Sequence, residues 1–233
     1  MPVTINPARV ALYWAPPATD SLAAAGASWL GYDAETGAAV MQPDMSGLQD
    51  ATAAPAGYGF HATLSPPMRL ATGWTEFITA AAELTARTPP FALPPLILDS
   101  LDGFLALREA TPCPALAALA EACLRAAHPH RLRPDDAELA RRRTALSAAE
   151  DMLLLRWGYP HVLDRWRFHM TLTRRLAPAE ADILRPLADR HFSAAISKPR
   201  SVGALTVFTQ AHAGAAFRIA ERLSFTAKTS LLF

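Results

Sequence analysis

Two short segments of the sequence repeat one pattern of histidine and threonine. They read Phe-His-Ala-Thr-Leu from residue 60 and Phe-His-Met-Thr-Leu from residue 168. In a β-strand, side chains two residues apart point to the same face, so His61 projects with Thr63 and His169 projects with Thr171. The residues between and around them are apolar and fit the opposite, buried face. One His-x-Thr-Leu is weak evidence, but two copies, each after a phenylalanine, favour a shared catalytic site.

Two imidazoles that face one cleft suit general acid–base catalysis. An ordinary histidine has a pKa of ~6.5, so near neutral pH one ring can accept a proton from water while the other donates one to a leaving oxygen. The hydroxyls of Thr63 and Thr171 can donate hydrogen bonds to phosphoryl oxygens. A histidine metal site normally includes a third ligand, but no Asp or Glu lies within several residues of His61, and Asp164 falls on the face opposite His169. We therefore expect neither a metal nor a cofactor, and the sequence leaves open which histidine is the acid.

Other polar side chains share the face of the motif residues. Arg167 lies two residues before His169, and Arg175 has the same parity if the strand extends so far. In the first strand, Arg9 and Tyr13 fall on one face. A guanidinium group binds phosphate through two parallel hydrogen bonds. The candidate substrate-binding residues are therefore Arg9, Tyr13, Arg167 and Arg175.

The elements that must position these residues also repeat. Strands are expected at 10–15, 58–65, 92–98, 103–107, 166–173, 202–209 and 217–225, and helices at 20–30, 74–87, 114–127, 147–158 and 179–192. Each motif strand is followed by a helix and two strands, which indicates a degenerate internal duplication. We expect residues 34–57 to form a loop and the prolines at 66 and 67 to end the first motif strand. Segment 131–143, with five arginines among acidic residues, is typical of a solvated helix face.

These elements predict an α+β fold in a single domain of residues 1–233 with two similar lobes. The first lobe spans roughly residues 58–110, a helical insert roughly 112–158, and the second lobe roughly 164–228. We expect each lobe to carry an antiparallel sheet flanked by helices, with a central cleft between the lobes. If a pseudo-twofold axis relates the lobes, their two His/Thr faces meet across that cleft.

Composition narrows the class of protein further. The chain has 233 residues, of which 51% are hydrophobic and 18% charged, so it can bury a core. Its net charge of +1 argues against a general nucleic-acid or membrane-surface binder. Two cysteines with no Cys-x-x-Cys, no signal peptide and no long apolar run favour a cytoplasmic location. The sequence contains no Gly-x-x-x-x-Gly-Lys loop and no Gly-x-Ser-x-Gly elbow.

The paired motifs resemble those of the two-histidine phosphoesterases, which include the RNA 2′-5′ ligase-like proteins and cyclic phosphodiesterases. The blocks at 11–17, 58–64, 137–143, 157–160 and 168–173 are most similar to the phosphonate-metabolism branch, encoded with carbon–phosphorus lyase genes. The resemblance implies a bilobal RNA ligase-like fold and metal-independent opening of a cyclic phosphodiester, with both histidines and both threonines at functional positions. It departs at Ser65, because that branch often has lysine there, so phosphate-binding charge must come from elsewhere.

The expected function is therefore that of a metal-independent cyclic phosphodiesterase acting on a small phosphorylated sugar or nucleotide. The resemblance points to 5-phosphoribosyl 1,2-cyclic phosphate, the product of carbon–phosphorus lyase. One alternative is an RNA-end enzyme that hydrolyses 2′,3′-cyclic phosphates, but it needs a basic groove with aromatic stacking. The other is a non-catalytic sensor of a phosphate ligand. We expect no membrane or long nucleic acid as a partner, and the oligomeric state and the direction of ring opening stay open.

Overall fold

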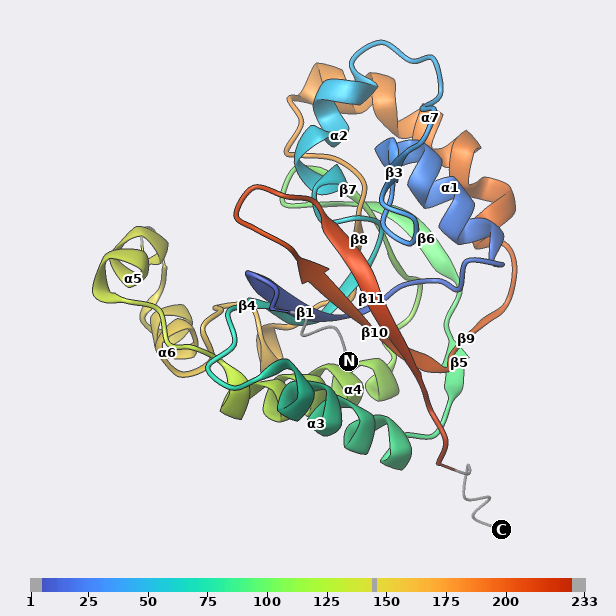
Figure 1. The fold of residues 1–233 in the computed structure, drawn as a ribbon. Helices are drawn as coiled ribbons and strands as arrows, with labels where there is room; N and C mark the ends of the chain where they lie inside the picture. The colour runs from blue at the N-terminus through green and yellow to red at the C-terminus, as the bar shows by residue number, and fades with distance from the viewer. Residues whose placement is uncertain (1–5, 144–145, 228–233) are drawn as a thin grey trace.

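A seven-stranded antiparallel sheet forms the centre of the protein (Figure 1), in a computed structural model that describes residues 6–143 and 146–227. The remaining residues of the predicted 1–233 domain, 228 among them, lie outside the described residues. The strands of the sheet are β1 (Arg9–Trp14), β4 (Ala62–Met68), β6 (Leu96–Leu101), β7 (Phe104–Glu109), β8 (Met170–Thr171), β10 (Ala204–Gln210) and β11 (Phe217–Ser224). Two short two-stranded sheets pair β2 (Tyr32–Asp33) with β3 (Ala38–Ala39) and β5 (Phe91–Leu93) with β9 (Arg200–Val202).

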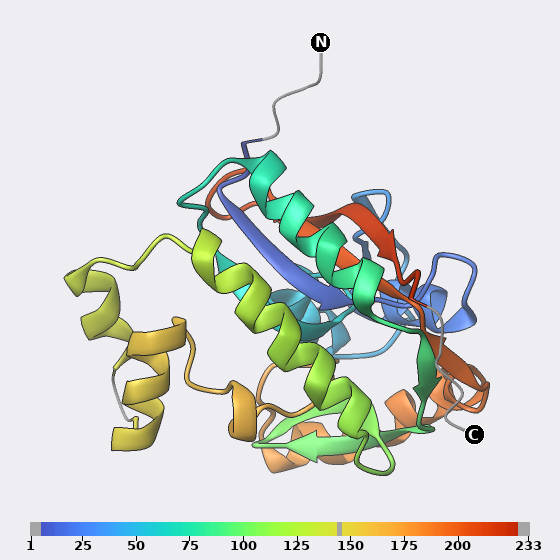
Figure 2. The same ribbon diagram turned by 90° about the horizontal axis from the view of Figure 1, so that it is seen from below.

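Helices cover the two halves of the main sheet. They are α1 (Ser21–Leu30), α2 (Leu48–Ala56), α3 (Trp74–Arg87), α4 (Pro114–Ala127), α5 (Asp136–Arg142), α6 (Ala148–Trp157) and α7 (Pro178–Ile196). Helices α3 and α4 lie side by side and contact β4, β10 and β11, whereas α1 packs on α7 and α7 contacts β6. Helices α5 and α6 project from the rest of the molecule (Figure 2). Among the described helices, none has the length and hydropathy needed to cross a bilayer.

The two histidine motifs lie next to each other at the middle of the sheet. The strand order is β11-β10-β1-β4-β8-β7-β6, and β4 pairs with β8 through Ala62 and Met170. The fold class is thus α+β with antiparallel sheets, as the sequence predicted. This one residue pair joins the half β11-β10-β1-β4 of the sheet to the half β8-β7-β6. His61 and His169 are the residues directly before Ala62 and Met170, on adjacent strands.

The halves of the sheet differ from the predicted lobes, because each hairpin crosses to the other motif strand. The β6–β7 hairpin follows the first motif in the chain but pairs with β8, which belongs to the second motif. The β10–β11 hairpin follows the second motif but pairs with β1, the neighbour of β4. Neither half of the sheet is therefore built from one of the predicted lobes, 58–110 or 164–228, alone. The segments exchange hairpins within one continuous sheet.

The two faces of the motif strands follow the predicted parity. Phe60, Ala62 and Leu64 are buried in the main core, as are their counterparts in the second motif, Phe168, Met170 and Leu172. A separate apolar cluster on the other face contains Ala11, Tyr13, Phe208 and Phe217. This second cluster supports the side of the sheet on which the motif histidines lie.

The segments directly before and after the first histidine motif differ from the prediction. The supposed loop at 34–57 contains β2, β3 and helix α2, in which the Thr52 hydroxyl donates to the Leu48 carbonyl and accepts from Gln42. Packing of α2 on α1 stabilises a helix that contains a proline, Pro55, near its end. Strand β4 also continues through Pro66 and Pro67, where a register shift opposite β1 accommodates residues that lack an N–H.

Candidate functional site

One cavity of about 610 Å³ is lined by both motif histidines and both motif threonines. Thr63 lies on β4 and Thr171 on β8, and His61 and His169 are the residues directly before these two strands. We call this space the histidine cavity. The structure thus brings together the four residues that the sequence singled out, although β8 is only two residues long and the expected strand 166–173 is otherwise irregular.

Each imidazole is held by a carbonyl two residues upstream. The Nδ1 atom of His61 lies 2.9 Å from the oxygen of Gly59, and the Nδ1 atom of His169 lies 2.9 Å from the oxygen of Arg167. A carbonyl can only accept, so in each neutral ring Nδ1 carries the proton and Nε2 carries the lone pair. Both histidines are therefore set to exchange protons through Nε2.

Gly59 is needed to place this carbonyl. Its φ of +73° lies in the left-handed region that favours glycine. A Cβ atom there would also lie 2.7 Å from the Cβ of Ala34, closer than side-chain carbons approach each other. The carbonyl that orients His61 therefore depends on a residue without a side chain.

The ring of His61 is packed between its cavity and an aromatic support. Tyr13 stacks on it with ring centroids 3.7 Å apart and planes 17° apart, and Phe208 lies behind at 5.9 Å. Burial raises the pKa of the Tyr13 phenol well above its usual range, so it stays protonated. Tyr13, a predicted substrate-binding residue, lines the cavity mainly as the support of His61.

Burial lowers the pKa of both histidines. The pKa of His61 falls to about 4, because desolvation outweighs the Gly59 hydrogen bond and His169 adds repulsion. The pKa of His169 is also lowered, by burial and by the charges of His161 and Arg167, against the opposing bond to the Arg167 carbonyl. A buried imidazole disfavours its charged form. His61 is therefore neutral across the physiological range, and negative charge placed in the cavity would favour protonation of either ring.

The motif threonines present hydroxyl groups beside these rings. The Oγ1 atom of Thr63 lies 3.2 Å from Nε2 of His61, so its O–H donates to the ring lone pair in this tautomer. Thr171 lines the same cavity from the neighbouring strand. When a substrate is bound, each hydroxyl can turn its single O–H toward a phosphoryl oxygen near the Nε2 atoms.

The predicted arginines are not all in the cavity. Arg9 and Arg175 line it, and the Nε atom of Arg9 donates to the Gln210 side chain over 2.7 Å. Arg167 instead lines a different pocket, between Glu109 and the start of α4. Arg167 does not line the histidine cavity, because the backbone before Met170 is not a strand and two-residue parity does not apply there.

Sequence reasoning missed three further lining residues. Arg142 of α5 lines the cavity, as do the aromatic rings of Tyr58 and Tyr159, which are 39% and 38% exposed. Arg142 lies in the segment 131–143, which was expected to be solvated. Because positive and negative charges balance in this segment, its composition did not indicate that Arg142 points into the cavity. The only local indication was the spacing of four residues between Glu138 and Arg142, which allows an ion pair on one helix face.

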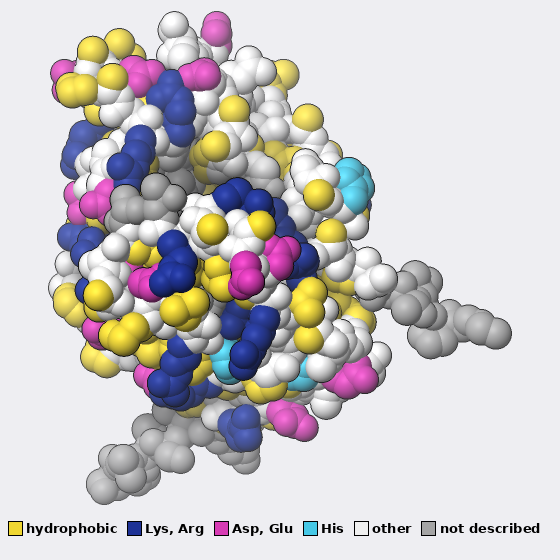
Figure 3. Space-filling model, turned by 90° about the vertical axis from the view of Figure 1, so that its left-hand side faces the viewer, with side chains coloured by type: hydrophobic (Ala, Val, Ile, Leu, Met, Phe, Trp, Pro, Cys, Tyr) yellow, Lys and Arg dark blue, Asp and Glu magenta, His cyan; other side chains and the backbone are white. Residues whose placement is uncertain are grey.

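The face on the α5–α6 side carries many arginine side chains with acidic groups among them (Figure 3). Arg174 lines the cavity but is occupied by ion pairs with Asp50 and Glu180. Within residues 6–143 and 146–227, no group of three or more His, Cys, Asp or Glu side chains is placed to hold a metal ion. The charged groups that remain available toward the cavity are guanidinium groups.

Two His-x-Thr-Leu segments thus lie on adjacent central strands with their imidazoles in one cavity, which is the motif pair on which the resemblance to two-histidine phosphoesterases rests. A family model described as "Protein of unknown function (DUF1045)" matches residues 63–218, and the chain belongs to this family. The family's description assigns no reaction.

Two curated relatives are named ribose 1,5-bisphosphate phosphokinase PhnN. The protein from Janthinobacterium sp. (strain Marseille) is 36% identical over 230 residues, which cover 94% of this chain and 51% of the relative. The one from Laribacter hongkongensis (strain HLHK9) is 40% identical over 217 residues, covering 91% of this chain and 50% of the relative. The chain thus spans about half the length of the curated relatives it matches.

Similar solved structures include one titled as a phosphoesterase and several of E. coli LigT. The phosphoesterase is 15% identical with a TM-score of 0.45, and LigT complexed with 3′-AMP is 16% identical with a TM-score of 0.46. Each alignment covers 95% of this chain and 99% of the other chain.

Proposed function

We propose that this protein is a phosphoesterase that hydrolyses a cyclic phosphodiester without a metal ion. One observation carries this proposal: two imidazoles line one cavity, and each is fixed by its Nδ1 atom so that Nε2 is the proton-exchanging atom. Hydrolysis of a cyclic phosphate needs one proton removed from water and one delivered to the leaving oxygen. The paired rings supply both functions.

In the proposed reaction, His61 is the base and His169 the acid. The Nε2 atom of neutral His61 accepts a proton from water, and the water oxygen forms a bond to phosphorus. The ring P–O bond breaks, and protonated His169 donates its Nε2 proton to the departing oxygen. The assignment follows from burial, because the pKa of about 4 keeps His61 neutral. Substrate charge favours protonation of His169 once the phosphodiester is bound.

The substrate that we propose is 5-phosphoribosyl 1,2-cyclic phosphate, in the breakdown of phosphonates. The names of the curated relatives support this, because they refer to ribose 1,5-bisphosphate. Opening the ring by breaking the bond between O2 and phosphorus leaves the phosphate on O1 and yields that compound. His169 would then protonate O2.

The kinase activity in the relatives' names is not part of the proposal. The matched region is half of each relative, and this sequence has no Gly-x-x-x-x-Gly-Lys loop to cradle nucleotide phosphates. In the proposed sequence of reactions, this chain supplies the bisphosphate that a kinase then uses.

A 2′,3′-cyclic nucleotide is the second candidate substrate, and Tyr58 and Tyr159 favour it. Both rings are partly exposed where they line the cavity, and exposed aromatic rings are common stacking surfaces for bases. Tyr58 is already stacked on Phe217, with ring centroids 5.4 Å apart. The two candidates differ in whether a base or a second phosphate must be accommodated.

Phosphorus NMR of the protein in the presence of a chelator tests both candidates. We expect the ribosyl substrate to open to ribose 1,5-bisphosphate, and His61→Gln or His169→Gln to slow this on the order of 100- to 10,000-fold. His212→Gln, at an exposed turn, is the matched control. Opening of the cyclic nucleotide alone would favour the RNA-end activity. Loss of all turnover in chelator, or full activity of either variant, would contradict the mechanism.

A further inference from the structure

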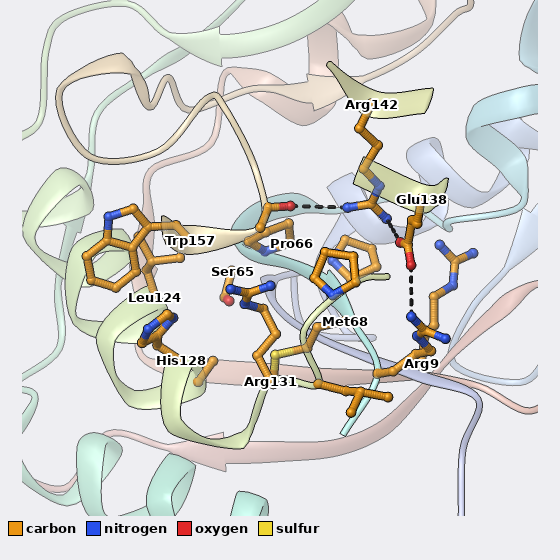
Figure 4. Close-up of a pocket in the computed structure, with 16 residues that line it drawn as sticks. Arg9, Ser65, Pro66, Met68, Leu124, His128, Arg131, Glu138, Arg142 and Trp157 are labelled. Carbon is orange, nitrogen blue, oxygen red and sulfur yellow. Dashed lines mark hydrogen bonds and ion pairs between the residues drawn. The ribbon is translucent and has the colours of Figure 1, made fainter. Parts of the chain in front are cut away.

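A second, smaller pocket of about 160 Å³ adjoins the histidine cavity. We call it the basic pocket; it lies between β4, α4 and the α5–α6 segment, and its polar lining includes Arg9, Ser65, His128, Arg131, Glu138 and Arg142 (Figure 4). With Arg69, it has four arginines against one carboxylate. This excess of positive charge makes it a candidate site for an anion.

Arg131 forms no ion pair within the described residues, whereas Arg69 and Arg142 of the same pocket both pair with Glu138. Its guanidinium is half-buried, and its Nη2 atom donates to the Arg156 carbonyl over 3.2 Å at the end of α6. Its Nε atom is buried and has no hydrogen-bond partner among the described residues. Burial and the nearby Arg133 and Arg142 lower its pKa, which means that further negative charge is favoured beside it. A buried donor without a partner is costly unless a ligand satisfies it.

The position of Arg131 is fixed by its neighbours. A Cβ atom on Gly158, at the end of α6, would lie 2.6 Å from Nη1 and 2.9 Å from Cζ of Arg131. The guanidinium therefore packs directly on the glycine backbone. His128, beside it, has its pKa lowered by burial and by these cations, and its buried Nδ1 also lacks a partner among the described residues.

Arg142 connects the two spaces. Its Nη1 atom donates to the Gly158 carbonyl over 3.1 Å, and its Nη2 atom lies 2.6 Å from Glu138. Glu138 also pairs with Arg69 at 2.8 Å, so one carboxylate holds two arginines at the edge of the pocket. The residues that line both the basic pocket and the histidine cavity are Arg9, Pro66, Pro67, Arg142 and Gly158. An elongated molecule can therefore reach from one to the other.

We propose that the basic pocket binds a terminal phosphate monoester of the same substrate whose cyclic phosphate lies between the two histidines. The inference rests on the proposed function and specifies its substrate class as a sugar cyclic phosphate with a second phosphate. A phosphate dianion matches the charge excess, and its oxygens can accept from the guanidinium groups that line the pocket. Ser65, which replaces the lysine expected by resemblance, lines the same pocket, and Arg131 supplies the charge there.

Two paired substrates test this assignment: 5-phosphoribosyl 1,2-cyclic phosphate, and ribose 1,2-cyclic phosphate without the second phosphate. We expect Arg131→Gln to lower kcat/KM for the first on the order of 10- to 100-fold and to leave the second unchanged. Arg185→Gln, which removes an exposed arginine on α7, is the control for charge loss and should change neither. Equal losses on both substrates, or no loss on either, would overturn the inference.

Calorimetry with ribose 5-phosphate gives a reading that needs no turnover. The wild type and His61→Gln should bind it, and Arg131→Gln should bind at least tenfold more weakly. This binding pattern with no hydrolysis of either cyclic substrate would overturn the proposed function but support the basic pocket. Equal binding by Arg131→Gln would overturn the pocket alone. Faster opening of the unphosphorylated substrate on adding inorganic phosphate, lost in Arg131→Gln, would support the inference, because the free ion would then take the place of the missing phosphate group.

Discussion

The pKa of His61 predicts how much stability the protein loses in acid. The ring has an ordinary pKa of 6.5 in the unfolded chain and about 4 in the folded protein. Below 6.5 the unfolded chain binds a proton that the folded chain excludes, so stability falls as the pH falls. Each pH unit in that window costs about 1.4 kcal/mol. At about pH 4.5 the loss due to His61 is therefore about 2.5 kcal/mol relative to neutral pH.

Urea unfolding of the wild type and His61→Gln between about pH 7.5 and 4.5 measures this loss. The variant lacks the titrating ring, so its stability should fall by about 2.5 kcal/mol less than that of the wild type. His212→Gln removes an exposed imidazole and should follow the wild type. Parallel curves for the wild type and His61→Gln would refute the claim that burial keeps this ring neutral, and with it the reason for making it the base.

Three further outcomes follow from the same structure. The kcat/KM profile should be bell-shaped with its maximum on the acidic side of 6.5, because both histidine pKa values are lowered in the free enzyme; a maximum above pH 7 would contradict this. Gly59→Ala should lower the free energy of unfolding by at least about 1 kcal/mol more than Gly214→Ala. Both glycines have a positive φ, but only Gly59 lacks space for a Cβ atom, and a comparison of the denaturation midpoints of the two variants measures the difference. Arg200→Gln should cost on the order of 3 kcal/mol of unfolding free energy, because its ion pair with Asp20, the N-cap residue of α1, is buried. Arg174→Gln should cost much less, because its ion pair with Asp50 is exposed to solvent, and equal costs by calorimetry would rule out this difference in burial.

The sequence pattern correctly predicted those helices and strands whose stabilising contacts are made by residues close together in the chain. Helices at 74–87 and 114–127 have the predicted bounds, and Ser147 forms the capping box that begins α6. Strand parity also predicted which motif side chains are buried, because one face of the sheet is fully covered by the core. These features depend on residues close together in the chain.

What the sequence could not predict depends on contacts between distant segments. Nothing near β7 indicates that it pairs with β8, so the exchanged hairpins were not foreseen. Parity also failed at Arg167, where the backbone leaves the strand to bring its carbonyl to His169. Arg142 faces inward only because α5 folds back toward Gly158, and the composition of segment 131–143 gives no sign of that.

The exchange of hairpins also determines when the site can form during folding. Arg9 of β1 hydrogen-bonds to Gln210 of β10 across 201 residues, and the aromatic support of Tyr13 comes from Phe208 and Phe217 of the last two strands. Pairings this distant in sequence slow folding. A ribosome-bound chain that already contains both histidine motifs therefore still lacks the wall behind His61, and the site is completed only when the final hairpin docks against the first strand.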